Sequence, residues 1–145
     1  MRYTSGRCAR VFYLHIEHGE DPVNTIRDFV SKQEIQAGII HLIGAVRNAR
    51  IVTGPKEDTL PPDPSFVSLQ QAHEVIGTGM IRTGSEGPEI HFHISAGRGD
   101  TALTGCLRGE SEVFIIIEAV IIEFSSMEIG MSHDPKTGLS LPDPV

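Results

Sequence analysis

The stretch Glu89-Ile90-His91-Phe92-His93-Ile94-Ser95 alternates between polar and apolar residues at every position. Successive side chains of a β-strand point to opposite faces, so this period of two predicts a half-buried strand. The three apolar side chains are expected to face a core, and the two histidines share the other face. Two imidazoles at positions i and i+2 can bind one cation, and neutral imidazole suits Zn²⁺ and similar divalent metals. The alternative is a polar outer face that happens to contain two histidines.

The sequence around this strand has one helical pattern and several strand patterns. Asp21 can accept a hydrogen bond at a helix start, and Pro22 suits the first helical position. Val23, Ile26 and Val30 then share one helical face. Segments rich in β-branched and aromatic residues, separated by short polar or glycine-rich turns, predict strands. They cover residues 9–16, 38–46, 50–52, 74–82, 89–95, 102–108, 112–124 and 127–131.

One helix among many strands predicts an α+β fold, with a mainly antiparallel β-sheet and one principal helix packed on it. The length of 145 residues favours a single domain over residues 1–145. We expect irregular tails at residues 1–8 and 140–145 and a Pro-rich loop at residues 54–66. Gly44 lies inside a strand pattern and predicts a bend or bulge there.

A third metal ligand could come from Cys106, which lies 13 residues after His93. A hairpin turn at residues 97–100 would return the chain and can place this cysteine beside the histidines. A thiolate binds zinc strongly, and three protein ligands would leave a fourth position open, as is typical of catalytic zinc sites. The alternative is that Cys106 is a small buried core residue, as free cysteines usually are.

Several carboxylates are candidates for proton transfer or for supporting the ligands, namely Glu89, Glu112 and Glu118. Glu118 interrupts an otherwise apolar run over residues 114–122, and a buried carboxylate there needs a partner, a metal or a raised pKa. Alternatively, Glu118 lies on an edge strand and faces water. His41 lies in an apolar segment and is expected to be a hydrogen-bonded core or interface residue.

Composition excludes several classes of protein. The net charge of −7 lies entirely in residues 73–145, and this argues against a protein that binds phosphate backbones through Lys and Arg. The same acidic half holds the paired histidines, so carboxylates are expected near the cation site.

Apolar runs such as residues 113–117 are too short to span a membrane, and residues 1–10 have no apolar signal core. Two cysteines make no disulfide framework, which favours the cytoplasm.

The order of motifs resembles that of the plants-and-prokaryotes conserved (PPC) domain family, in its stand-alone prokaryotic form. The shared motifs are Arg10-Val11-Phe12-Tyr13-Leu14, Gly19-Glu20-Asp21, Ile43-Gly44-Ala45-Val46, His73-Glu74-Val75-Ile76-Gly77-Thr78-Gly79, His91-Phe92-His93-Ile94-Ser95, Gly105-Cys106-Leu107 and Asp134-Pro135-Lys136-Thr137-Gly138-Leu139. The resemblance implies an α+β fold, assembly as a homotrimer and a metal site, with zinc in some members. The fold is also similar to that of acetolactate decarboxylase, a metal-dependent lyase.

The family pattern has a His-x-His strand followed by a third histidine in a Gly-Gly-His-Leu segment. His91 and His93 match the pair, whereas this chain reads Thr104-Gly105-Cys106-Leu107, so Cys106 replaces the third histidine. Prokaryotic members are often labelled DNA-binding, but this chain has no basic appendage. We therefore predict a small cytoplasmic homotrimer with a divalent-metal site, zinc or a similar ion, at these three residues. The alternatives are a lyase- or hydrolase-like metal-dependent enzyme with Glu118 or Glu112 handling protons, and a DNA-binding regulatory module. A small-molecule or protein partner stays open.

Overall fold

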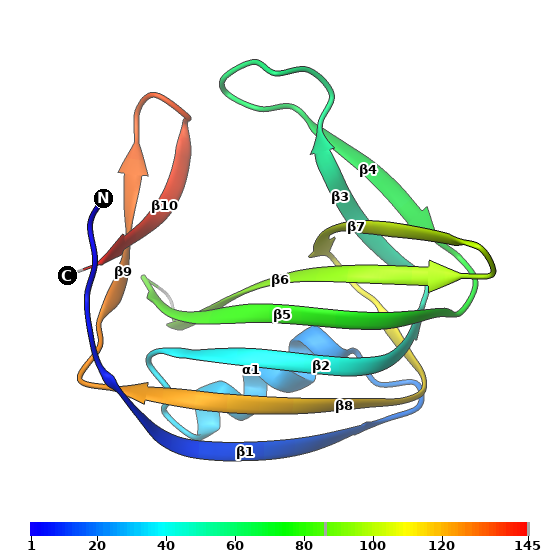
Figure 1. Ribbon diagram of the computed structural model, residues 1–145, viewed down its shortest axis with the longest axis horizontal. Coiled ribbons are helices and arrows are strands. Elements are labelled where there is room, and N and C mark those ends of the chain that lie inside the picture. Colours follow the sequence, from blue (N-terminus) through cyan, green and yellow to red (C-terminus); the bar gives the residue numbers. More distant parts are fainter. Residues whose placement is uncertain (86, 145) are drawn as a thin grey trace.

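An eight-stranded antiparallel sheet dominates the computed structural model, which describes residues 1–85 and 87–144 (Figure 1). Its strands are β1 (Arg7–Glu17), β2 (Gly38–Arg47), β3 (Ala49–Pro55), β4 (Pro64–Leu69), β5 (His73–Gly84), β6 (Gly87–Arg98), β7 (Thr101–Arg108) and β8 (Glu112–Ser125). They lie in the order β1-β8-β2-β5-β6-β7-β3-β4. A separate hairpin pairs β9 (Ile129–Asp134) with β10 (Leu139–Pro144), and the helix is α1 (Pro22–Lys32). The predicted antiparallel sheet with one helix is confirmed, although α+β describes so strand-rich a chain only coarsely.

Helix α1 covers one face of the sheet and begins where the sequence predicts. Asp21 caps it, because one carboxylate oxygen accepts a hydrogen bond from the Asn24 N–H at 2.8 Å. The other oxygen accepts from the Ser111 N–H at 2.9 Å, which ties the helix start to the turn before β8. Ile26 and Val30 are fully buried against the sheet. Burial of this apolar face holds the helix in place.

The double role of Asp21 yields a stability prediction. Replacing Asp21 by Ala removes the cap and leaves the Ser111 N–H without its acceptor, so we expect a loss of about 1–3 kcal/mol in the free energy of unfolding. Asp28→Ala is the matched control, because Asp28 lies exposed on the same helix. It should change stability by less than about 0.5 kcal/mol. Urea unfolding of the two variants measures both values, and equal effects would contradict the capping role.

The two faces of the sheet differ in what covers them. The face under α1 carries the core, including Ile40, Leu42 and Ile117, each at most 4% exposed. On the other face Ile43 and Ile76 lie directly opposite each other on β2 and β5, and they are 53% and 65% exposed. Tyr13 on β1 is likewise exposed. The second face is therefore apolar but uncovered in the single chain.

Three local expectations can be compared with the structure. Gly44 has φ +136° at a register shift between β2 and β8, as the predicted bulge requires. The expected tail at residues 140–145 is wrong over most of its length, because Leu139–Pro144 pairs with β9. The Pro-rich loop is shorter than expected, since β3 extends to Pro55 and β4 begins at Pro64. Both missed strands, β4 and β10, lie at sheet edges, where proline is tolerated because no neighbour needs its N–H.

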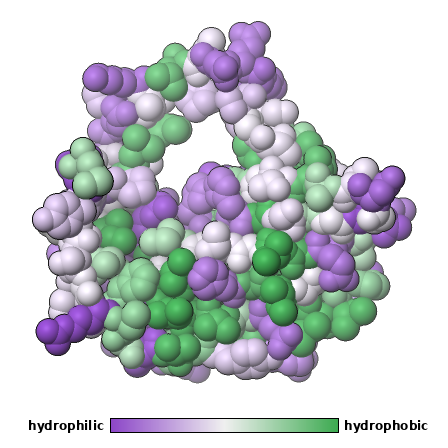
Figure 2. All heavy atoms as spheres, viewed as in Figure 1, coloured by the Kyte–Doolittle hydropathy of each residue, from purple (hydrophilic) through white to green (hydrophobic). Residues whose placement is uncertain are grey.

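Two extensions project from the sheet, β3–β4 on one side and β9–β10 on the other (Figure 1). Figure 2 shows the molecule hollowed between them. Their ends approach each other, because a Cβ built at Gly138 would lie 3.4 Å from the Cβ of Pro61. The extensions thus form an arch on the molecule. Among the described residues, no helix has the length and apolar character needed to cross a membrane.

Candidate metal centre

The predicted alternation along residues 89–95 is present in β6. Phe92 and Ile94 are each 2% exposed in the core, whereas His91 and His93 lie on the opposite face. The hairpin to β7 turns at residues 99–100, and its register places Cys106 directly opposite His93. Cross-strand neighbours on one face have close Cβ atoms, so the cysteine joins the histidines by strand pairing alone.

A close approach of strands next to Cys106 depends on Gly105. A Cβ at that position would lie 2.2 Å from the carbonyl oxygen of Val52 on β3. Only a residue without a side chain lets β3 pack this closely against β7. Cys106 is 6% exposed, and its strand β7 lies between β6 and β3, so it is not at an edge of the sheet.

The three side chains converge on one another and form what we call the donor cluster. The Nε2 atoms of His91 and His93 lie 3.0 Å apart, and the Sγ of Cys106 lies 3.3 Å from the Nε2 of His91. All three donor atoms lie within 4.8 Å of one another. The imidazole rings are stacked, with centroids 5.0 Å apart. One point in space is therefore within reach of two nitrogens and one sulfur.

These separations fit a tetrahedral zinc ion. Zn–N bonds of about 2.0 Å and Zn–S bonds of about 2.3 Å put two nitrogens about 3.3 Å apart and a nitrogen and a sulfur about 3.5 Å apart. The two spacings from the Nε2 of His91 are shorter by about 0.2–0.3 Å, and the third pair, His93 and Cys106, lies within 4.8 Å. Small side-chain rotations supply such a difference, so the donor set fits the metal that the sequence predicts.

Burial disfavours the charged forms of His91 and Cys106. It lowers the pKa of His91 to about 4, and the positive charges of Arg108, His93 and Arg82 act in the same direction. His91 is therefore neutral at pH 7, the form in which imidazole binds metals. Burial also raises the pKa of the Cys106 thiol, against a smaller opposing effect of Arg108. Zinc binding would displace the thiol proton, because the metal takes the thiolate.

An open cleft of about 710 Å³ lies beside the donor cluster, and we call it the donor cleft. His93 and Cys106 form part of its wall, and most of the remainder is apolar. The other lining residues are Val52, Thr53, Gly54, Pro55, Pro62, Pro64, Phe66, Thr104, Gly105, Arg108 and Leu139. Leu139 comes from the β9–β10 hairpin and the prolines come from the β3–β4 extension. The arch therefore gives the cluster a ligand-sized space.

The predicted proton carriers lie apart from the cluster. Glu118 is half-buried on β8 and accepts a hydrogen bond from the Tyr13 hydroxyl at 2.5 Å, which raises the pKa of that tyrosine. Strand β8 is internal and lies three strands from β6, about 14 Å at the usual strand spacing. Glu112 forms an ion pair with Arg47, and hydrogen bonds from Arg47 and Asn48 lower the pKa of the Glu112 carboxyl. Neither carboxylate belongs to the donor cluster.

Two further residues can be placed. Glu89 is exposed near the start of β6, opposite Arg82 on β5. His41 is exposed on the uncovered face of β2 and not in the core, because alternation along β2 places its neighbours Ile40 and Leu42 inside. The carboxylates expected near the cation site do not line the donor cleft within the described part of the chain.

Sequence reasoning missed the contribution of Arg108 and Phe66 to the cleft. Arg108 lies two residues after Cys106 on the same strand, so period-two alternation places both on one face and could have identified it. Phe66 belongs to β4, which the proline-rich composition concealed.

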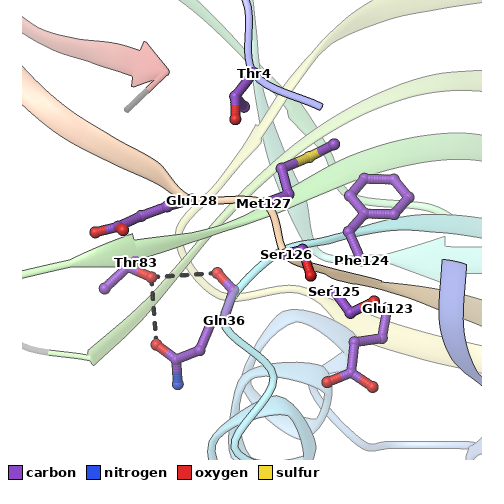
Figure 3. Close-up of a pocket in the computed structure, with 9 residues that line it drawn as sticks. All are labelled: Thr4, Gln36, Thr83, Glu123, Phe124, Ser125, Ser126, Met127 and Glu128. Carbon is purple, nitrogen blue, oxygen red and sulfur yellow. Dashed lines mark hydrogen bonds between the residues drawn. The ribbon is translucent and has the colours of Figure 1, made fainter. Parts of the chain in front are cut away.

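A second cleft, of about 640 Å³, lies where the end of β8 meets the chain after α1 (Figure 3). The Thr83 hydroxyl there is 3.3 Å from both the backbone and the side-chain carbonyl oxygens of Gln36. Glu123 lines the same cleft but forms an ion pair with Arg10 at 2.5 Å. Its lining residues include none of the donor cluster, so the metal centre remains the stronger candidate site.

Solved structures with this fold include two archaeal proteins. A metal-containing protein from Archaeoglobus fulgidus is 25% identical, with a TM-score of 0.87 over 98% of this chain and 99% of the other. A PPC protein from Pyrococcus horikoshii is 24% identical, with a TM-score of 0.85 over 100% and 99%. A Bacteroides thetaiotaomicron protein named as a candidate DNA-binding protein is 24% identical, with a TM-score of 0.75 over 95% and 96%.

Curated proteins gave no significant match to this sequence. The structural likeness at these identities shows the fold, which is shared over nearly the whole chain. The sequence carries the family assignment independently. The profile of the Plants and Prokaryotes Conserved (PCC) domain matches residues 3–125, and the chain belongs to this family, the one that the motif order resembles.

Proposed function

We propose that this protein binds one zinc ion through the Nε2 atoms of His91 and His93 and the Sγ of Cys106. The observation that carries the proposal is the convergence of these three donors within 4.8 Å at the wall of an open cleft. The similarity to a protein described as metal-containing supports it, as does the match of the two histidines to the family's His-x-His strand. Cysteine in place of the third histidine keeps a ligand at that position.

The donor chemistry favours zinc over other common metals. Two imidazoles and a thiolate suit a borderline-soft divalent ion, whereas Mg²⁺ and Ca²⁺ prefer several oxygen ligands. Three protein ligands would leave a fourth position of the ion free of protein, and the donor cleft adjoins two of these ligands. Bound zinc supplies an electrophilic centre there. The proposed role is therefore the metal-dependent binding of a small ligand. The alternative is that the protein also catalyses a reaction of that ligand.

We further propose that three chains assemble through the uncovered face of the sheet. The support is the family resemblance together with the exposed apolar side chains on that face, which include Tyr13, Ile43 and Ile76. Single monomeric domains rarely leave a contiguous apolar patch in water, and such patches mark interaction sites. The proposal includes no direct contact with nucleic acid, because the chain carries a net charge of −7.

Metal analysis of two cysteine variants tests the zinc site. The wild-type protein, purified without chelator and supplied with zinc, should contain about one zinc per chain. Cys106→Ser removes the sulfur ligand and should weaken zinc binding at least tenfold, measured by competition with a chromophoric chelator. Cys8→Ser is the matched control, since Cys8 is exposed on β1. A zinc-free wild type, or equal zinc affinity in the two variants, would contradict the proposed ligand set.

A further inference from the structure

The donor cleft carries positive charge although the protein as a whole is acidic. Arg108 is the one charged side chain among its described lining residues, and the lining includes no carboxylate. The full chain has 19 acidic and 12 basic residues, so we expect most of the protein surface to carry more acidic than basic side chains. The cleft therefore differs in sign from the molecule around it.

A second arginine lies next to this charge, on the neighbouring strand. Arg108 on β7 lies directly opposite Arg50 on β3, and like charges at directly opposed positions destabilise a strand pair. Among the described residues, neither arginine forms an ion pair or a side-chain hydrogen bond. The Arg50 guanidinium instead lies 3.7 Å from the ring centroid of Phe66, which lines the cleft. An anion between the two arginines would offset their repulsion.

The arginine pair is close to the donor cluster. Arg108 follows Cys106 by two residues on the same face of β7, and Val52, opposite Cys106, also lines the cleft. Arg108 lines the same cleft as His93 and Cys106. Arg82 on β5 lies opposite Glu89, so its charge has an acidic neighbour, and it is not among the described lining residues of the donor cleft. Arg108 is therefore the arginine best placed beside the open metal position.

We propose that the donor cleft binds a small organic anion whose carboxylate or phosphate head is held by Arg108 beside the metal. Guanidinium groups hold both kinds of head through paired hydrogen bonds. The hydrocarbon part of the ligand packs on the apolar wall, which includes Phe66, Pro62 and Leu139. The position of the head at the metal rests on the zinc site proposed above, whereas the contact with Arg108 does not.

Calorimetric titration of the zinc-supplied protein tests the inference with three probes that share a phenyl ring. Benzoate and phenyl phosphate carry the two anionic heads, and benzamide is the neutral analogue of benzoate. We expect at least one anion to bind tenfold or more tightly than benzamide, and the better one identifies the head group. Arg108→Gln should remove this preference. Arg27→Gln is the matched control, because it deletes the same charge on α1, across the sheet, and should leave binding unchanged.

Two readouts on the same samples separate the ways in which the inference could fail. Arg108→Gln should unfold at the same or a higher temperature than the wild type, since it relieves the like-charged pair. The inference is overturned if Arg108→Gln retains the preference for anions. It is also overturned if the wild type binds benzamide with the same affinity as the anions, or if it binds none of the three probes at millimolar concentration. Metal analysis tests the zinc site independently, because a zinc-free sample contradicts that site whatever the anion affinity of the Arg108→Gln variant.

Discussion

His91→Ala and His93→Ala are each expected to lower zinc affinity at least 100-fold. Each removes one of three ligands, and replacement of even a residue that only supports a ligand costs 10- to 100-fold in other metal sites. The loss should also appear in stability. Zinc at a free concentration of 100 times its Kd stabilises the folded wild type by about 2.7 kcal/mol, because it binds the folded state. Neither variant should gain comparable stability at that zinc concentration.

Urea unfolding with zinc and with chelator measures this difference directly. His15→Ala is the matched control, because His15 is exposed on β1, four strands from β6. It should gain as much stability from zinc as the wild type does. If the His93→Ala protein gains the same stabilisation as the control, the donor cluster is not where zinc binds.

Ile43→Asp and Ile76→Asp are expected to convert the proposed trimer into single chains. The two isoleucines lie opposite each other on the uncovered face of β2 and β5. A carboxylate buried in an apolar interface without a partner loses its hydration, and this penalty applies in every subunit of the assembly. Since the monomer leaves these positions exposed, the single chains should stay folded.

Sedimentation equilibrium checks this expectation. Three chains of 15.8 kDa give about 47 kDa for the wild type, and the variants should fall to the mass of one chain. Leu60→Asp is the control, because Leu60 is equally exposed but lies in the β3–β4 loop, away from this face. A wild type of 15.8 kDa would contradict the trimer, as would variants that keep the wild-type mass.

The sequence predicted the donor cluster because local patterns determine it. Alternation alone puts His91 and His93 on one face, and the short connection to β7 leaves few registers by which Cys106 can return beside them. The helix start was predicted for the same reason, since Asp21 and Pro22 act within one turn. These features need no knowledge of which distant segments meet.

Features that depend on the pairing of strands distant in the sequence could not be predicted from the sequence. Whether Glu118 faces water or a partner depends on Tyr13, which lies 105 positions away and meets it only through the β1–β8 pair. The opposition of Arg50 and Arg108 likewise requires β3 to pair with β7 across the chain order. No local pattern indicates that pairing, so the arginine pair could not be predicted, although alternation along β7 places Arg108 on the same face as Cys106.

Crystallography with anomalous scattering at the zinc edge would show which atoms bind the metal. We expect one peak per chain, bonded to the Nε2 atoms of His91 and His93 and to the Sγ of Cys106, with its fourth position toward the donor cleft. The absence of a peak in zinc-supplied crystals, or a peak whose ligands exclude Cys106, would contradict the account.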